Sequence, residues 1–232
     1  MTDLLKAEFY KLSRSRSFWG ITLFSLLLGS VLLLDSIAIT DGLVNASLFN
    51  TPLLYFLSIV FGSLFVGADF AEQTLHSFVS AGHKRSSVLF AKTAAYQAAG
   101  LLILGLPLVI HLVLGILTGN GSRIVLAQFF SDAALLFAAL IAMGMLPLVC
   151  GFIFRDIGRT LGVPIVLYFI MIFLLNGDSA RKTAVFLPMG QLRLLALNDL
   201  PVSKLILIGI DLLWTALLYA AAYGSFCHSD LD

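Results

Sequence analysis

Charged side chains are scarce in this sequence. Asp, Glu, Lys and Arg make up 12% of its 232 residues, whereas about a quarter of a typical soluble domain is charged. The formal net charge is only +1, so no electrostatic field favours a nucleic acid as partner. The two cysteines, Cys150 and Cys227, form neither a CxxC pair nor a disulfide framework. We interpret both as small apolar side chains.

Motifs for catalysis and nucleotide binding are also absent from the sequence. No G-x-x-x-x-G-K-S/T loop is present to hold ATP phosphates. Neither HExxH, nor GxSxG, nor a pair of intramembrane carboxylates supports a membrane enzyme. His76 and His83 lie in one polar connection without a third candidate ligand, which does not make a zinc site. We therefore expect a chain that is not an enzyme and that binds no metal or cofactor itself.

Apolar residues, by contrast, are abundant: they make up 59% of the chain, and its mean hydropathy is +1.01. Lipid suits this composition, and in lipid each backbone polar group must be satisfied within its own segment, which favours helices. A helix crosses the membrane with about 20 apolar residues. We predict an all-α integral membrane protein, a single transmembrane domain over 1–232, with six transmembrane helices near 18–39, 52–69, 87–117, 128–154, 160–176 and 204–226.

Local signals predict where several of these helices begin and end. The run 18–39 exceeds the roughly 7–15 residues of a cleaved signal-peptide core, so we expect it to be retained. Thr51 and Pro52 have the residue types of a helix cap followed by a first-turn proline, and they predict the start of the second helix. Residues 70–81 are expected to form a short helix that Gly82 ends. Ser86 or Ser87 would then cap the third long helix.

Basic residues predict the orientation of the chain in the membrane. With an inner N-terminus, nine of the 14 Lys and Arg residues lie in inner segments and five in outer ones. The inner side usually carries the excess, so both termini are expected in the cytoplasm. The inner nine are Lys6, Lys11, Arg14, Arg16, Lys84, Arg85, Lys92, Arg155 and Arg159, and the outer five are Arg123, Arg181, Lys182, Arg193 and Lys204.

The segment before the first span has an amphipathic pattern. At 100° per residue, Leu5, Phe9 and Leu12 share one face of a helix, and Lys6, Lys11 and Arg14 lie on the other side. We predict an N-terminal interfacial amphipathic helix over 1–17, an elbow that lies in the inner headgroup layer against membrane lipid. A basic tail without fixed structure is the alternative.

Polar residues concentrate in one connection, "FVGADFAEQTLHSFVSAGHKRSSVLFAKTAAY" at 65–96. Together with "LLKAEFYKLSRSRSFW" near the N-terminus, it resembles the type-2 (exporter-class) permease subunits of ATP-binding-cassette transporters. The likeness is closest to small six-span bacterial permeases linked to antibiotic-peptide export and immunity. The family pattern there is an acid followed by an aromatic, Thr-Leu, Gly-x-x-Arg and then a Lys. Asp69-Phe70, Thr74-Leu75, Gly82, Arg85 and Lys92 occupy those places, and the six-span layout extends the resemblance over nearly the whole chain.

The resemblance implies a role for residues 70–86 as a coupling loop. Its short cytoplasmic coupling helix would dock on a separate cytoplasmic ATPase subunit, which would bind ATP and Mg, and an ordinary solvated loop is the alternative. The chain would act in the bacterial cell membrane as a dimer with a second copy of itself or a related permease. The residues implied in ATPase coupling are Asp69, Phe70, Glu72, Thr74, Leu75, Phe78, Gly82 and Arg85.

Two further regions bear on transport. Residues 177–203 are too short and too interrupted to span, and we expect two short helices forming an external lid, with a loose outer loop as the alternative. A path between two bundles would be lined by aromatic residues of the second and fifth spans, unless these rings face lipid. Such walls suit an amphipathic substrate. An antimicrobial or toxin-like peptide is the first choice, and sodium or another drug is the next. The residues are Tyr55, Phe56, Phe61, Phe65, Tyr168, Phe169 and Phe173.

Ionisable residues inside the spans keep other functions open. His111 and Asp211 lie within apolar runs, where such groups are often functional, so an ion-coupled secondary transporter is the main rival. The alternative for Asp211 is a satisfied structural or gate-lining side chain. No internal repeat supports the architecture of many secondary transporters. A non-transporting membrane partner or immunity protein is a further possibility.

Overall fold

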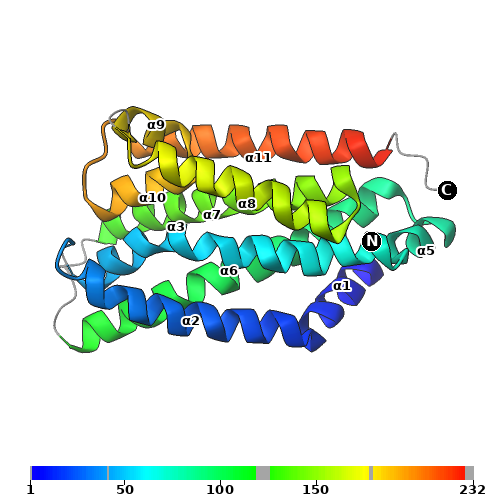
Figure 1. Cartoon of the computed structure of the whole chain (residues 1–232), viewed down its shortest axis with the longest axis horizontal. Coiled ribbons are helices and arrows are strands. Elements are labelled where there is room, and N and C mark those ends of the chain that lie inside the picture. The colour runs from blue at the N-terminus through cyan, green and yellow to red at the C-terminus, as the bar shows by residue number, and fades with distance from the viewer. Residues whose placement is uncertain (1, 41, 119–125, 178–179, 228–232) are drawn as a thin grey trace.

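The computed structural model describes residues 2–40, 42–118, 126–177 and 180–227. These ranges contain helices and no strand, and Arg123, one of the cations counted above, lies outside them. Six helical segments are long and apolar enough to cross a membrane, and they run side by side along the long axis (Figure 1). The chain is therefore an all-α protein with the helices of a multi-pass membrane protein.

The six spans are formed by the longest helices. They are α2 (Arg16–Ser36), α3 (Leu43–Gly62) with its continuation to Ala71, α6 (Arg85–Leu117), α7 (Leu126–Phe154), α8 (Ile157–Leu174) and α11 (Lys204–Cys227). The short helices are α1 (Thr2–Arg14), α5 (Thr74–Ser80), α9 (Ala180–Phe186) and α10 (Pro188–Ala196). Helices α1 and α5 lie at one end of the bundle, called here the α5 end, and α9 lies at the other (Figure 1).

The second span begins earlier than Thr51, so the expected cap there is wrong. Gly42, with φ 91°, lies directly before the helix, and α3 starts at Leu43. Pro52 lies inside the helix, and the hydroxyl of Thr51 donates back to the Ser47 carbonyl at 3.0 Å instead of capping a helix start. The apolar residues from Leu43 onward extend the helix outward, which outweighs the local cap signal.

The connection between the second and third spans differs from the single short helix expected over 70–81. The second span ends in α4 (Ala68–Ala71), and Gln73 at φ 55° separates α4 from α5. Gly82, at φ 88°, ends α5 as predicted, with its N–H donating to the Val79 carbonyl at 3.0 Å. The third span begins at Arg85 after Lys84, whose side chain makes no cap bond, so neither expected serine caps it.

A π-helical turn, η1 (Ser63–Gly67), joins α3 to α4. Such turns occur as single insertions in α-helices, frequently at functional sites. Two glycines allow close packing around it: a Cβ on Gly67 would lie 3.1 Å from Ile157 Cα, and one on Gly151 only 2.6 Å from Val66 Cγ1. The turn thus packs closely against α7 and α8.

The core is built around α3 and α7, while α2, α8 and α11 are largely peripheral. Ala91, Ala95 and Ala99 are fully buried, which allows α6 to lie close to its neighbours.

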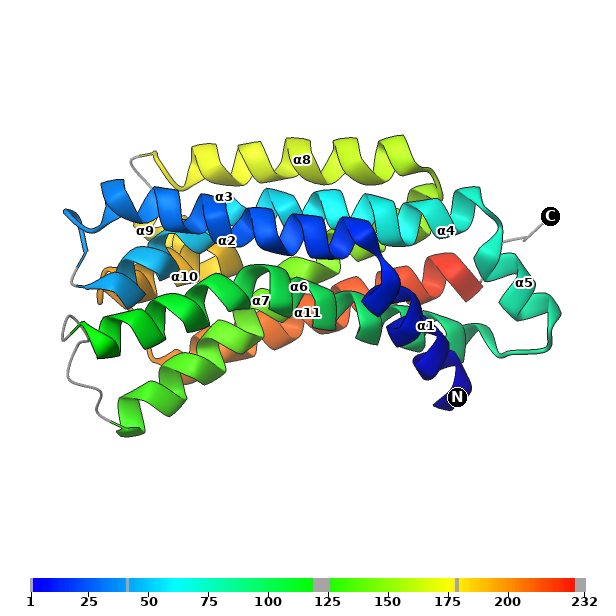
Figure 2. The same cartoon turned by 90° about the horizontal axis from the view of Figure 1, so that it is seen from below.

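Residues 177–203 contain two short helices as predicted, and all but one residue of α10 is buried, against α3 and α7. Figure 2 shows α1 leaving α2 at an angle and crossing the α5 end of the bundle.

Candidate functional site

Helix α1 packs on the bundle with a face that shares only Leu12 with the apolar face predicted to lie against lipid. Leu4, Glu8 and Leu12 are buried, whereas Phe9 is 43% exposed and Leu5 is half-buried. The helix packs against α6, and the buried face is turned so that it includes an acid. The reason is electrostatic, because Glu8 finds a cation on α6. Hydrophobicity alone does not set the orientation of the elbow.

A buried set of ion pairs lies where α1, the end of the second span and α6 meet. The Lys92 ammonium donates to Glu8 Oε2 at 2.6 Å and to Asp69 Oδ2, and Lys11 donates to Asp69 Oδ1. Lys92 and Asp69 are fully buried and Glu8 nearly so. The Lys92 nitrogen also lies 4.2 Å from the centroid of the Phe65 ring, a cation–π contact. We call Glu8, Lys11, Phe65, Asp69 and Lys92 the Lys92 network.

The Lys92 network is electrically balanced, with two acids and two cations. Buried charges are tolerated when they are paired and hydrogen-bonded, and here each acid has a cation within reach. Breaking such a set by removing one partner is costly because it leaves a buried charge behind. The network therefore fixes the elbow, the second span and the third span to one another at the α5 end.

The apolar residues predicted to couple to an ATPase mainly support the chain's own core. Leu75 is fully buried. Phe70 and Phe78 pack partly against the core, and the Phe70 ring meets those of Phe152 at 5.3 Å and Phe226 at 6.3 Å between centroids. The pattern of loop residues did not show this, because the inward turn of α5 depends on its neighbours in space.

Arg85, also predicted as a coupling residue, is bound to the end of the last helix. Its Nη1 donates to the carbonyls of Phe226 at 2.9 Å and Cys227 at 3.1 Å. The last carbonyls of a helix lack partners within it and carry partial negative charge, so an arginine stabilises them. Arg85 is half-buried.

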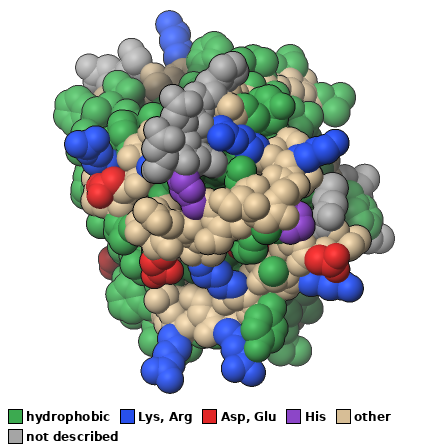
Figure 3. Space-filling model, turned by 90° about the vertical axis from the view of Figure 1, so that its right-hand side faces the viewer, with side chains coloured by type: hydrophobic (Ala, Val, Ile, Leu, Met, Phe, Trp, Pro, Cys, Tyr) green, Lys and Arg blue, Asp and Glu red, His purple; other side chains and the backbone are tan. Residues whose placement is uncertain are grey.

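The exposed residues around α5 are polar or small, while Phe78 and Val79 are half-buried. Figure 3 views this end and shows charged and histidine side chains and backbone atoms across it. Five of the exposed polar residues there, Glu72, Gln73, Ser77, Ser80 and His83, are called here the α5 surface; Ala71, Ala81 and Lys84 are exposed beside them. Of the other predicted coupling residues, Gly82 is exposed, Thr74 is half-buried, and Asp69 belongs to the Lys92 network. Within the described ranges, no three His, Cys, Asp or Glu side chains are grouped as metal ligands would be.

The predicted path residues fall into two groups. Tyr55, Phe61, Phe65 and Tyr168 are buried inside this chain, with Phe61 stacked on Phe65 at 5.2 Å between ring centroids. In contrast, Phe169 and Phe173 are exposed at 63% and 79% on the outer side of α8, and Phe56 is half-buried. The structure does not bring the seven residues together on one wall of this chain.

The two intramembrane ionisable residues differ in how they are satisfied. His111 is buried between two serines, with Nδ1 2.9 Å from Ser47 Oγ and Nε2 3.1 Å from Ser30 Oγ. Asp211 is fully buried beside Gln191, and neither carboxylate oxygen makes a hydrogen bond to the described residues. His111 thus joins α2, α3 and α6, whereas Asp211 has Gln191 as a polar neighbour but no hydrogen bond of normal geometry to the described residues.

The sequence analysis missed Glu8 and Lys11 as functional candidates. Lys11 was placed on the polar face of the predicted amphipathic helix, Glu8 was given no role, and Lys92 was matched only to the family pattern. One signal was available, because a lysine within an apolar helix needs an acidic partner, and Glu8 is an acid in the adjoining elbow.

Neither the protein-family models nor the curated protein sequences compared with the chain contain a match.

Proposed function

We propose that this chain is the permease subunit of an ATP-binding-cassette exporter and that a separate ATPase subunit docks at its α5 end. The observation that carries the proposal is the Lys92 network beside the α4–α5 connection. A force on α5 acts on both adjoining spans, and the ion pairs add the elbow to the same unit. This is the mechanical link that a permease without a phosphate loop requires.

The docking site in this proposal is the α5 surface. Its polar side chains set the register of the partner, while Phe70, Leu75 and Phe78 hold the segment rigid from beneath. In this proposal the exposed residues of the α5 surface contact the ATPase. The buried apolar residues beneath them support that surface and do not contact the partner. ATP and Mg are bound by the ATPase.

The same proposal gives the membrane, the orientation, the partner chain and the cargo. The chain sits in the bacterial cell membrane with both termini in the cytoplasm, paired with a second copy or a related permease. The elbow lies at the inner headgroup layer, where Tyr10 and Trp19 are exposed and the Arg14 guanidinium carbon lies 5.3 Å from the Tyr10 ring centroid. The cargo is an amphipathic molecule, with an antimicrobial or toxin-like peptide as the first class to test.

Docking is tested by co-purifying the ATPase expected from the neighbouring gene with variants of this chain. Ser77→Trp places a bulky ring on the α5 surface, where the parent side chain is exposed and its hydroxyl donates to the Gln73 carbonyl. We expect at least tenfold less ATPase recovered, with normal amounts of the variant in the membrane, because the ring prevents close approach.

Thr118→Trp is the matched control. Thr118 is also exposed and its hydroxyl also bonds back to the carbonyl four residues earlier, that of Leu114, but it lies at the opposite end of the bundle. This variant should retain the ATPase. Equal recovery with the two variants would exclude the α5 surface as the docking site.

An ion-coupled secondary transporter is the second candidate, favoured by the unpartnered Asp211. The two mechanisms differ in their energy source. Export that stops when ATP is removed and persists when a protonophore collapses the proton gradient supports the exporter, and the reverse pattern supports the ion-coupled transporter.

A further inference from the structure

Asp211 differs from the other buried acids in having no cation beside it. Three acids are buried in the described part of the chain, Glu8, Asp69 and Asp211. The first two pair with Lys92 and Lys11, whereas no cation of the described residues lies within ion-pair distance of Asp211. An isolated carboxylate buried away from water gives up its charge, because desolvation of the ion is so costly. Asp211 therefore needs a ligand that neutralises it.

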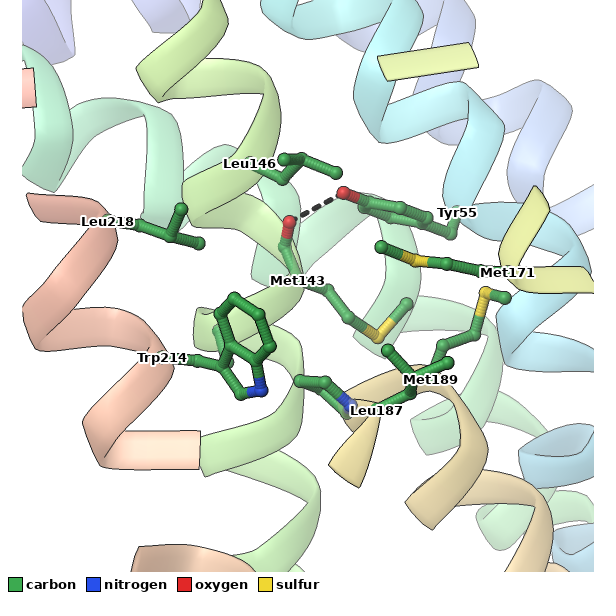
Figure 4. Close-up of a pocket in the computed structure, with 10 residues that line it drawn as sticks. Tyr55, Met143, Leu146, Met171, Leu187, Met189, Trp214 and Leu218 are labelled. Carbon is green, nitrogen blue, oxygen red and sulfur yellow. Dashed lines mark hydrogen bonds between the residues drawn. The ribbon is translucent and has the colours of Figure 1, made fainter. Parts of the chain in front are cut away.

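The face of α11 that carries Asp211 is otherwise apolar. Asp211, Trp214 and Leu218 share this face, because their spacings are three and four residues. Figure 4 shows the side chains around Trp214 and Leu218, which are apolar apart from the Tyr55 hydroxyl, and this hydroxyl is donated to a backbone carbonyl (dashed line). The Trp214 indole N–H is likewise donated, to the Phe186 carbonyl at 2.8 Å. Neither group has a hydrogen left to stabilise a charge on this face.

The polar neighbour of Asp211 is Gln191, in α10. Its amide nitrogen donates to the Val185 carbonyl at 3.0 Å. This bond orients the amide, since the reverse orientation would bring two carbonyl oxygens together. The Gln191 Oε1 atom is buried and, like both carboxylate oxygens of Asp211, accepts no hydrogen bond from the described residues. Neighbouring side chains of α10 and α11 thus hold three buried acceptor oxygens and lack a donor.

The charged and titratable groups of the surrounding elements are engaged elsewhere. Helix α11 packs against α7, α6 and α9, and α10 contributes Gln191. Lys182 of α9 is exposed at the protein surface. The other groups in this half of the bundle, with their partners, are Asp132 on α7 with Lys204 of α11, His111 on α6 with Ser30 and Ser47, Arg181 on α9 with Asp199, and Arg193 on α10 with Leu175 and Asn176.

We propose that Asp211 binds a proton in the folded chain and that the neutral carboxyl joins α11 to Gln191 of α10. A protonated carboxyl has one O–H donor and keeps acceptor capacity. One proton, taken up from water as the chain folds, therefore removes the charge and supplies the missing donor. The described residues do not favour a metal ion instead, because Asp211 belongs to no group of three His, Cys, Asp or Glu side chains.

This proton site does not depend on the proposed function. In ATP-driven export the proton stays bound, and in ion-coupled transport it is released in each cycle. In both cases the contact between α10 and α11 requires the proton, since its loss leaves an unpaired carboxylate in an apolar setting beside Gln191.

Infrared difference spectroscopy of the purified chain in nanodiscs detects the proton directly. A protonated carboxyl has a carbonyl stretching band that a carboxylate lacks. We expect this band in the parent at neutral pH and its loss in Asp211→Asn. Asp132→Asn is the matched control, because Asp132 pairs with Lys204, and this variant should keep the band. Should Asp211→Asn not fold, Gln191→Met removes the acceptor and should move the band to higher frequency.

The pH dependence of unfolding in detergent provides a second readout. An unfolded aspartate loses its proton above about pH 4, whereas folded Asp211 keeps it, so the folded state binds the additional proton and its stability falls as the pH rises. Relative to Asp211→Asn, the unfolding equilibrium constant of the parent should rise about tenfold per pH unit above that point, until the folded chain releases the proton. Asp132→Asn should follow the parent between about pH 5 and 7.

Three results would overturn the proposal. A carboxyl band that is the same in the parent and in Asp211→Asn, or unmoved in Gln191→Met, would show that Asp211 holds no such proton. A stability ratio of the parent to Asp211→Asn that does not change with pH would show the same. Unfolding that responds to sodium at fixed pH and ionic strength would identify a metal cation as the ligand. No ATPase is present in these measurements, so their failure is distinct from failure of the α5 surface to dock one.

Discussion

Replacing Lys92 by methionine keeps the length of the side chain and removes the cation that Glu8 and Asp69 share. In the parent, the Lys92 nitrogen is 2.6 Å from Glu8 Oε2 and also binds Asp69, and all three side chains are buried. Asp69 retains Lys11 in the variant, but Glu8 loses its cation. Removing one partner of a buried pair costs about 3–5 kcal/mol, so we expect the free energy of unfolding to fall by that amount.

The measurement is unfolding of the purified chain in detergent by a denaturant titration. Lys204→Met is the control, because Lys204 also pairs with an acid, Asp132, but both side chains are partly exposed. Its loss should cost less than about 1 kcal/mol. In a double-mutant cycle, Glu8→Gln combined with Lys92→Met should be less damaging than the sum of the single changes by about 0.5–3 kcal/mol. A Lys92→Met variant as stable as Lys204→Met, or an additive cycle, would refute the shared buried pair.

Two other substitutions test the remaining assignments. Arg85→Met removes two hydrogen bonds to the end of α11 and should lower the free energy of unfolding by about 1.5–3 kcal/mol. Hydrogen exchange should become faster only in the last turn of α11. Unchanged exchange there would contradict the capping role. Asp211→Asn keeps the shape of a buried, unpartnered acid and should leave ATP-driven export intact in membrane vesicles, whereas loss of export with normal folding would favour the ion-coupled mechanism.

The positions of the spans were predictable because hydrocarbon imposes long apolar helices, and five of the six were located to within a few residues. The exception, the start of α3, was missed because Thr51 and Pro52 carry a real cap signal that the apolar residues from Leu43 to Phe49 override. Gly82 was predicted correctly because a positive φ is a local requirement that the residue type reveals.

The candidate site was less predictable because its geometry depends on pairs far apart in sequence. Glu8 and Lys92 are 84 residues apart, and Arg85 and Phe226 are 141 apart. Whether Leu75 points into the core or away from it depends on how α5 settles on the bundle, which helical periodicity over seven residues does not fix. The sequence identified the polar connection, but not which of its residues remain accessible.

The 84-residue separation between Glu8 and Lys92 also sets an order for the making of the protein. At about 5–20 residues per second, Lys92 is synthesised roughly 4–17 s after Glu8. Asp69 precedes Lys92 by only 23 residues, so for most of that interval Glu8 is present without either of them. The N-terminal helix can reach its final position only when the third span arrives, so a chain cut short after the second span leaves Glu8 without its cation while Asp69 still has Lys11, a feature that distinguishes unfinished copies from complete ones.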